Sequence, residues 1–462
     1  MNLEVKFLKY KIMVVFLILL IACGNSVFSV GNTSNNTNKS ILSKYSTINM
    51  NLTNNTNNRT IYVNYNYGND ENDGLTPTKP KKTLRNAAQN AIENGTIYLE
   101  KGTYNEGKTF SRSILPWESK EKDETNPIEI NKNQTIVSEN AILEGIALSF
   151  SNQTSIRIRN ITFQNCQDTI LSFDANVIVE NCVFKNNKLE NGSLINKKSG
   201  NLILSNCQFV ENTGNTGVAV YNGPGNSIIM NSTFQRNNAT EDGGAVYSIG
   251  NLIIKSSIFN CSSASKSGGA ICIKHGSANI TDSIFSNSQG HDGGAIKNLD
   301  IDNEESIGIC TIIRCNFTNN EGTVGGAINN WGTCLIEECN SNNNTSFSGG
   351  FINNRGNCTV TYNTITNNEA CGGGAVSNVG KIVLKFNTIT GNSADCGFTI
   401  LNEYGCTVIA TDNWWGSNSD PKDQFVGEVT YSPILASPPN IPTATKTKNQ
   451  EISKKLKITD IK

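Results

Sequence analysis

The sequence predicts an all-β repeat fold, because two motifs recur along it with a similar spacing. The first is Gly-Gly-Ala, whose leading glycine recurs after 25, 25, 32, 24 and 24 residues. The second is a large apolar anchor residue. The leading glycines are Gly243, Gly268, Gly293, Gly325, Gly349 and Gly373, and the anchors are Phe184, Phe209, Phe234, Phe259, Phe285, Phe317, Ile365 and Ile389. A period in this range indicates a solenoid, a propeller or another repeat array.

Each repeat contains three elements in a fixed order: an apolar strand such as Leu252–Ile254, the anchor with a following asparagine, and the Gly-Gly-Ala segment. Three short strands joined by tight turns fit one coil of a parallel β-helix, in which each coil rises by about 4.8 Å, the distance between paired strands. A propeller blade needs about 40 residues, and a leucine-rich repeat needs its own leucine pattern. We therefore predict a right-handed parallel β-helix with about eleven three-strand coils of about 24 residues each.

Stacked coils place like residues above one another, so each repeated position has an expected role. The anchors should stack inside the coil, Gly-Gly should form a tight corner, and the alanine should face inward where walls approach closely. Asparagines at the turns should adopt left-handed backbone angles and hydrogen-bond along the axis. Ser341 occupies the anchor position between Phe317 and Ile365, which predicts a weak point in the stack.

Ahead of the repeats, the pattern predicts a cap that contains one amphipathic helix. Apolar residues fall at helical spacing from Leu84 to Ile92, and Gly95 ends the helix. The other expected elements are a strand at Ile61–Val63, a strand at Thr96–Leu99 and a turn at Lys101–Tyr104.

The first residues predict an export signal. Lys6, Lys9 and Lys11 form a basic region, and the apolar run that follows, Ile12–Ala22, is too short to cross a bilayer comfortably. Two alternatives stay open, a lipid on Cys23 after cleavage and an uncleaved signal anchor. Each of them places the remaining chain at the cell surface or outside the cell, and the many Asn-X-Ser/Thr sequons suit a secreted glycoprotein.

The expected organisation therefore has five segments. They are a signal peptide (1–29), a disordered Asn/Thr/Ser linker (30–59), an N-terminal cap (60–134), the parallel β-helix (135–435) and a disordered basic tail (436–462).

The cysteines follow the same repeat. Cys310, Cys334 and Cys358 are 24 residues apart, so we expect them to stack at about 4.8 Å. Stacked cysteines can form a disulfide at that distance, but they also serve as small buried hydrophobic residues. Free buried thiols are the expected state, and at least one disulfide is the alternative. No Cys-X-X-Cys pair exists, so no metal is expected.

The composition excludes several kinds of partner. Charged residues make up 17% of the chain and the formal net charge is -1, so no basic surface for nucleic acid or for an anionic membrane is expected. Membrane contact is expected only through the N-terminal signal or a lipid on Cys23. Because Gly-Gly-Ala recurs in coil after coil, it is architectural rather than phosphate-binding, and no cofactor is expected.

Asp242 and Asp292 are the candidate catalytic residues, together with His291. The two aspartates hold the same repeat position two coils apart, with Ser267 between them, which predicts a separation of about 9.6 Å. That is at the edge of the range for the carboxyl pair of an inverting glycosidase. Aspartate before Gly-Gly is also a favoured turn residue, so we expect no catalysis from this pair.

The interval from Gly293 to Gly325 is the longest between repeats, and its surplus lies around Leu299–Glu305. This segment is acidic and is expected to protrude from one corner. Loops on a regular scaffold often carry binding, but the expected role of this segment is a solvated excursion.

The alternation of Gly-Gly-Ala-Ile/Val with Phe-X-X-Asn resembles the repeats of polymorphic outer membrane proteins. The wider layout is similar to the adhesin-like surface proteins of methanogenic archaea, with Asn-Asp-Gly-Leu-Thr-Pro and Asn-Gly-Thr-Ile-Tyr-Leu in the cap and a closing Asn-Trp-Trp-Gly. The resemblance covers roughly residues 60 to 435 and implies a pectate-lyase-like β-helix that is displayed on a cell surface for adhesion.

Three functions remain open at this point. The first is a non-enzymatic adhesin that attaches to cell-surface glycans or to partner cells. The second is a polysaccharide lyase or glycoside hydrolase on the same scaffold, since a fold does not determine a function. The third is a passive spacer in the cell envelope. The expected function is the adhesin.

Overall fold

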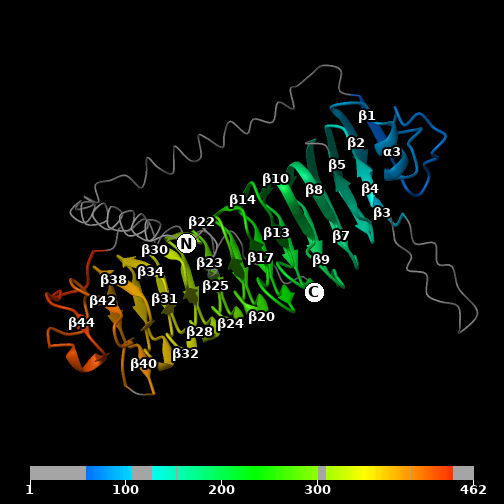
Figure 1. Cartoon of the computed structure of the whole chain (residues 1–462). Coiled ribbons are helices and arrows are strands. Elements are labelled where there is room, and N and C mark those ends of the chain that lie inside the picture. Colours follow the sequence, from blue (N-terminus) through cyan, green and yellow to red (C-terminus); the bar gives the residue numbers. More distant parts are fainter. Residues whose placement is uncertain (1–58, 107–126, 152–153, 300–307, 396, 441–462) are drawn as a thin grey trace, which may run out of the picture. The chain divides into compact units, whose positions relative to one another are not determined.

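The computed structural model describes residues 59–106, 127–151, 154–299, 308–395 and 397–440 (Figure 1). The predicted signal peptide with Cys23, almost all of the predicted linker and most of the tail lie outside the described residues. The acidic segment from Asp300 to Glu305 lies outside them as well. Within the described part, no helix has the length and apolar character needed to cross a membrane.

The cap begins with β1 (Thr60–Val63) and β2 (Gly95–Leu99), which pair in parallel, and α3 (Leu84–Asn90) packs against both. Thr83 caps the helix, because its side chain accepts a hydrogen bond from the backbone N–H of Asn86 at 3.1 Å. The helix ends earlier than predicted. Ala91 is already extended, and Ile92 is 41% exposed, so the expectation that Ile92 belongs to the apolar helix face is wrong.

The predicted turn at Lys101–Tyr104 is also wrong, because Gly102–Tyr104 forms strand β3. This strand pairs in parallel with β5 (Gln134–Glu144), and the Tyr104 ring is buried with its hydroxyl donating to the backbone carbonyl of Val63 at 2.7 Å. Pairing with β5 gives the backbone of Gly102–Tyr104 its hydrogen-bond partners. A pattern of only three residues does not reveal such a pairing from the sequence.

The chain is a right-handed parallel β-helix of about eleven turns, as predicted. Its first coils use long strands that continue around a corner. These early strands are β4 (Ile128–Ile130), β5, β6 (Leu148–Phe150), β7 (Ser155–Gln164), β8 (Leu171–Glu180), β9 (Val183–Lys185) and β10 (Ile195–Ser205).

Later coils use shorter strands that stack in three columns (Figure 1). The anchor column contains β11 (Gln208–Val210), β15 (Thr233–Gln235), β19 (Ile258–Asn260), β23 (Ile284–Ser286), β27 (Asn316–Thr318), β31 (Asn340–Asn342), β35 (Thr364–Thr366) and β39 (Thr388–Thr390). The column after Gly-Gly-Ala contains β13 (Val220–Asn222), β17 (Val246–Ser248), β21 (Ile271–Ile273), β25 (Ile296–Asn298), β29 (Ile328–Asn330), β33 (Ile352–Asn354), β37 (Val376–Asn378), β41 (Ile400–Asn402) and β43 (Phe425–Val426). The apolar column contains β14 (Asn226–Met230), β18 (Asn251–Lys255), β22 (Ser277–Thr281), β26 (Ile309–Ile313), β30 (Thr333–Glu337), β34 (Asn357–Thr361), β38 (Lys381–Lys385), β42 (Thr407–Ile409) and β44 (Val429–Thr430).

The middle coils carry a further short strand between the anchor and Gly-Gly. These strands form a separate eight-stranded sheet, here called the corner sheet. Its strands are β12 (Thr213–Gly214), β16 (Asn238–Ala239), β20 (Ser263–Ser267), β24 (Gln289–Asp292), β28 (Glu321–Val324), β32 (Thr345–Ser348), β36 (Glu369–Gly372) and β40 (Ser393–Ala394). A short 3-10 helix, η2 (Lys422–Gln424), follows the last full coil.

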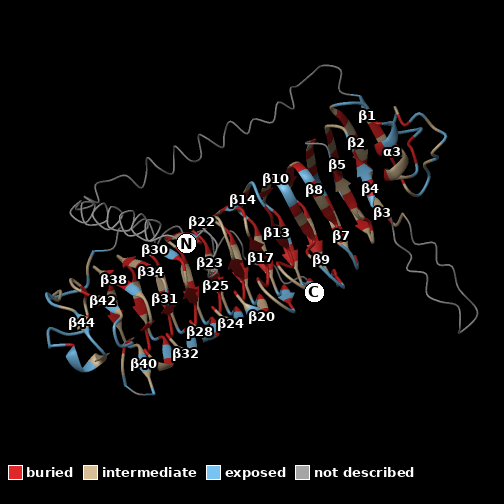
Figure 2. Cartoon of the chain, in the orientation of Figure 1, coloured by how far each residue is buried: buried red, intermediate tan, exposed pale blue. Residues whose placement is uncertain are grey.

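The anchor residues are buried, as predicted. Figure 2 shows that buried residues run along the strands of successive coils. From Phe163 to Phe317, neighbouring rings are nearly parallel, with centroids 4.6 to 5.0 Å apart. This spacing equals the rise of one coil, so each ring packs face to face on the next one without leaving its own strand.

Ser341 interrupts this stack, but the predicted weak point is filled from the opposite wall. Phe351 occupies the alanine position of its Gly-Gly-Ala segment, and its ring lies 6.2 Å from that of Phe317, tilted by 58°. The hydroxyl of Ser341 also donates to the side-chain oxygen of Asn368 at 3.0 Å. The small anchor and the large corner residue therefore compensate each other in volume.

The asparagines divide between two roles that the sequence analysis had combined. The asparagine of Phe-X-X-Asn is fully buried, and its side chain hydrogen-bonds to the next coil, as from Asn187 to Asn212 and from Asn212 to Asn237, both at 2.9 Å. The residue just before it adopts the left-handed backbone angle, as Asn186 does at φ 55°. The buried amides thus form a polar ladder inside the coil.

Gly-Gly forms the corner as expected. Gly293 has a φ of 75°, and a Cβ on the following Gly294 would lie 2.1 Å from the backbone oxygen of Gly326 in the next coil. The first glycine therefore supplies the backbone angle and the second allows the coils to approach. At the C-terminal end, Trp415 of the Asn-Trp-Trp-Gly segment is buried and packs edge-on against Phe425, with ring centroids 4.9 Å apart.

Candidate functional site

A groove of about 580 Å³ lies along the corner sheet. The first residue of each of five successive strands lines it, and so do His291 and Phe347. The five strand residues are Asn238, Ser263, Gln289, Glu321 and Thr345. Because the strands are parallel and in register, these side chains form a polar ladder at about 4.8 Å intervals.

Neighbouring rungs of this ladder are already hydrogen-bonded. The hydroxyl of Ser263 donates to Asn238 at 2.8 Å, and the amide of Gln289 donates to the Glu321 carboxylate at 2.7 Å. These contacts fix the orientation of the side chains and leave further donor and acceptor positions open toward the groove.

Phe347 is the prominent apolar feature of the groove, since its side chain is 66% exposed. It is the third residue of β32, and the corresponding residues of β24 and β28 are His291 and Thr323. An exposed aromatic ring beside a row of amides and hydroxyls offers one apolar platform and several directional hydrogen bonds. Sequence analysis missed Phe347, although an aromatic residue in a column of polar residues was a visible signal.

The charges in the groove restrict its ligands. Its lining contains one carboxylate, that of Glu321, and neither lysine nor arginine. Recognition of a polyanion normally relies on arginine or lysine, so this lining favours a neutral, hydroxyl-bearing ligand.

Of the three predicted site residues, His291 lies in the groove. Its Nδ1 is 3.1 Å from a carboxylate oxygen of Asp292. The other carboxylate oxygen of Asp292 contacts Nζ of Lys297 at 3.3 Å. The structure therefore brings His291 and Asp292 together, but Asp292 is held by a lysine.

Asp242 does not join this group. The backbone N–H of Gly243 bonds to Ser267, and that of Gly268 bonds to Asp292, which places Asp242 and Asp292 two coils apart in one column, as predicted. Neither aspartate belongs to the groove lining among the described residues. Their role in catalysis stays a prediction.

Lys297 is the most unusual charged residue near this site. Its side chain is fully buried, and Nζ lies 4.0 Å from the centre of the Trp331 ring. Burial lowers the pKa of Lys297 to about 8, against the opposing effect of Asp292. The guanidinium of Arg355 also packs on Trp331, at 4.9 Å.

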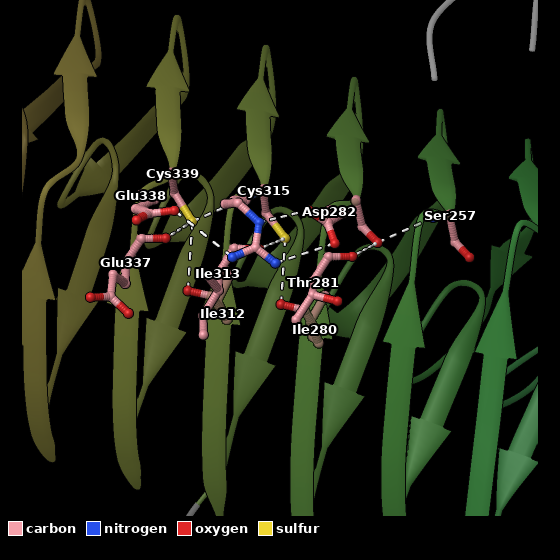
Figure 3. Close-up of polar contacts among 12 residues, drawn as sticks. Ser257, Ile280, Thr281, Asp282, Ile312, Ile313, Cys315, Glu337, Glu338 and Cys339 are labelled. Atoms are coloured by element: carbon pink, nitrogen blue, oxygen red, sulfur yellow. Dashed lines mark hydrogen bonds and ion pairs between the residues drawn. The ribbon is translucent and has the colours of Figure 1, made fainter. Parts of the chain in front are cut away.

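A second charged cluster lies at the turns that join the apolar column to the anchor column (Figure 3). Arg314 makes two hydrogen bonds to Asp282, at 2.7 and 3.3 Å, and lies 3.8 Å from Glu338. Successive turns thus alternate in charge, which stabilises the stacking of coils.

Beneath this cluster, Cys315 and Cys339 lie in adjacent coils, and their thiols donate to backbone carbonyl groups (Figure 3). Burial raises the pKa of the Cys315 thiol. The stacked cysteines of the interior, such as Cys310, Cys315, Cys334 and Cys339, are buried with free thiols, the state that the sequence analysis expected. Across the described ranges, no group of three or more metal-ligating side chains is present.

Comparison with known proteins supports the fold. A family model described as "Right handed beta helix region" matches residues 83–234 and, with overlap, 144–303. No curated protein sequence matches the chain.

Two solved structures are similar over most of the chain. A rhamnogalacturonan lyase aligns at 12% identity with a TM-score of 0.22, covering 82% of this chain and 84% of its own. The pectate lyase Pel9A aligns at 14% identity with a TM-score of 0.25, covering 83% of this chain and 80% of its own. The family match and the strand register together identify the chain's fold as a right-handed parallel β-helix.

Proposed function

We propose that this protein is an exported, non-enzymatic adhesin that binds neutral glycans of cell surfaces through the groove on the corner sheet. The supporting observation is the exposed ring of Phe347 at the side of a hydrogen-bonding ladder from Asn238 to Thr345. A sugar ring presents an apolar face and a rim of hydroxyl groups, which this arrangement complements.

The regular rise of the coils extends the argument to a polymer. Ladder residues repeat at about 4.8 Å along the axis, so equivalent side chains can contact successive units of an extended chain. Many weak contacts of this kind add up, and a groove of about 580 Å³ gives room for a few sugar units.

Binding of the full-length protein to an array of neutral and acidic glycans tests this proposal. We expect neutral glycans to bind, and we expect Phe347→Ala to weaken binding about tenfold through loss of the stacking surface. Phe386→Ala is the matched control, because Phe386 is an outer aromatic residue at a distant turn, stacked on Tyr362. Equal binding by Phe347→Ala and the wild type would contradict the proposal.

A glycoside hydrolase is the second candidate, and the contact between His291 and Asp292 is the observation that favours it. Release of reducing ends from the glycans that bind would reveal turnover. Activity that Asp292→Asn abolishes would replace the adhesin proposal, whereas binding without product release supports it. Absence of both binding and turnover would instead favour the passive spacer.

A further inference from the structure

Lys297 and Asn329 are neighbours on adjacent strands of the column that follows Gly-Gly-Ala. The register pairs Lys297 of β25 with Asn329 of β29, and both side chains are fully buried. They hold the middle position of these strands, where the side chain points to the opposite face from those of the two flanking residues.

Each middle residue faces the residue that precedes Gly-Gly in its own coil. Asp292 contacts Lys297 at 3.3 Å, and Ser348 accepts a hydrogen bond from the Asn353 amide at 3.0 Å. In the coil between them, the facing residue is Val324, which offers no polar atom.

Asn329 therefore has an unusual environment for a buried amide. Neither its side-chain nitrogen nor its side-chain oxygen has a hydrogen-bond partner among the described residues. Buried polar groups are rarely left in this state, because the loss of hydrogen bonds to water costs about 1–3 kcal/mol.

We propose that Lys297 and Asn329 form an intramolecular isopeptide bond, with Asp292 as the proton acceptor. The reacting amine, the amide and the carboxylate come from two adjacent coils, and the Trp331 ring covers the amine at 4.0 Å. The register places the two residues side by side on adjacent strands, which lowers the entropy cost of bringing their reacting groups together.

The reaction needs no additional reagent. The Lys297 ammonium gives one proton to Asp292, and the neutral amine attacks Cγ of Asn329 to form the Nζ–Cγ bond. The Cγ–Nδ2 bond breaks with its electron pair on Nδ2. A second proton from Nζ and the proton held by Asp292 move to Nδ2, so ammonium leaves and Asp292 becomes a carboxylate again.

The environment of Lys297 supports its role as a nucleophile. Burial lowers its pKa to about 8, so a neutral amine is reached easily near neutral pH. Asp292 is placed to accept the proton, and water exclusion by Trp331 protects the intermediate from hydrolysis.

The bond would join the coils on either side of the longest interval in the repeat. Lys297 and Asn329 are 32 residues apart, and this interval includes the acidic segment from Asp300 to Glu305. A covalent tie at this position would hold together the coil step with the largest insertion, as a disulfide restrains a loop.

Mass spectrometry of the full-length protein tests the inference. Trypsin normally cleaves after Lys274, Lys297, Arg314 and Arg355. We expect no cleavage after Lys297 and a branched peptide that joins residues 275–314 to residues 315–355, lighter than the sum of its parts by one ammonia. We expect Asp292→Asn to abolish the branch and Lys197→Met to retain it.

Three results would overturn the inference. One is cleavage after Lys297 in the wild type with unmodified fragments. Another is a loss of one water, with the link between Lys297 and Asp292. The third is an ammonia loss without a branched peptide, as a succinimide at an Asn-Gly pair would give. All three results are peptide masses measured on the wild-type protein, so they do not depend on the folding of a variant.

Discussion

Among the residues that the structure describes, two lysines, Lys197 and Lys297, are fully buried, and they are stabilised in opposite ways. Nζ of Lys197 donates to three backbone carbonyl groups, those of Gly223 and Pro224 at 2.6 Å and of Gly200 at 3.3 Å. All three of its protons are used, and no carboxylate is among these partners. Lys297 instead meets a carboxylate and an aromatic face.

Both lysines are paired with an asparagine of the next coil, which makes the comparison close. Asn222, beside Lys197, donates to Ser248 at 2.8 Å and accepts from Ser227 at 2.7 Å. Asn329, beside Lys297, has no such partners among the described residues. Burial is the main cause that lowers the pKa of each lysine to about 8, so the difference in chemistry must come from their neighbours.

The largest effect is expected at Lys197. Lys197→Met keeps most of the side-chain volume but leaves three carbonyl groups without their donor, which should lower the free energy of unfolding by about 3 kcal/mol. Urea denaturation followed by circular dichroism measures this. Lys188→Met, at an exposed position, is the control and should change stability by less than about 0.5 kcal/mol. A similar small effect at Lys197 would show that its carbonyl contacts contribute little.

The pH dependence of stability separates the two lysines further. The pKa of Lys197 is about 8 in the folded chain, whereas an unfolded lysine has a pKa of about 10.4. Between these values the unfolded chain binds one more proton, so this residue makes stability rise with pH by about 3 kcal/mol, with no slope below pH 8.

Other groups titrate in the same range, so the useful quantity is the difference between the wild type and Lys197→Met. Lys297 cannot titrate once it is part of an amide. A further loss of slope in Lys297→Met would therefore indicate a free amine and contradict the proposed bond.

A smaller effect is expected at Asp292. In protein that has not formed the bond, Asp292→Asn removes the charge partner of Lys297, and because Asp292 is partly exposed the expected loss of stability is about 1–2 kcal/mol. Asp242→Asn is the matched control, since Asp242 holds the same column position, but Tyr247 stands in its coil where Lys297 stands in the other. Thermal denaturation of both variants measures the difference, and equal melting temperatures would contradict an energetic role for the ion pair.

The smallest stability effect is expected from Val324→Ser, which gives Asn329 a hydroxyl partner similar to the one that Ser348 gives Asn353. Stability should change by less than about 1 kcal/mol, but the yield of the branched peptide should fall several-fold because the amide is engaged. Val324→Ala lacks the hydroxyl and is the control. An equal yield in both variants would show that bond formation does not require an Asn329 amide without hydrogen-bond partners.

Much of the fold could be predicted from the sequence, because parallel stacking repeats each residue's environment every coil. The Phe184 stack, the Gly293 corner and the Cys310 column all follow from spacing alone. The compensation between Ser341 and Phe351 could not, since it joins two different columns across the interior. The repeat spacing assigns each residue to a column, but it does not show which residues of different columns contact each other across the interior.

The candidate site was harder to predict for the same reason. His291 and Asp292 were identified as neighbours in sequence, but the contact of Asp292 with Lys297 depends on how the corner sheet folds over the next strand. A middle residue of a strand normally faces solvent, so neither the burial of Lys297 nor that of Asn329 is visible in a period-two pattern.

The in-register stacking also determines how the protein should respond to mechanical tension. Each coil contacts mainly its two neighbours, so a pull applied at one end would peel coils away one at a time rather than unfold the whole chain together. Each detached coil of about 24 residues would release about 80 Å of extended chain. The chain would therefore lengthen in steps under tension, and a covalent link between Lys297 and Asn329 would keep the residues between them from adding to that length.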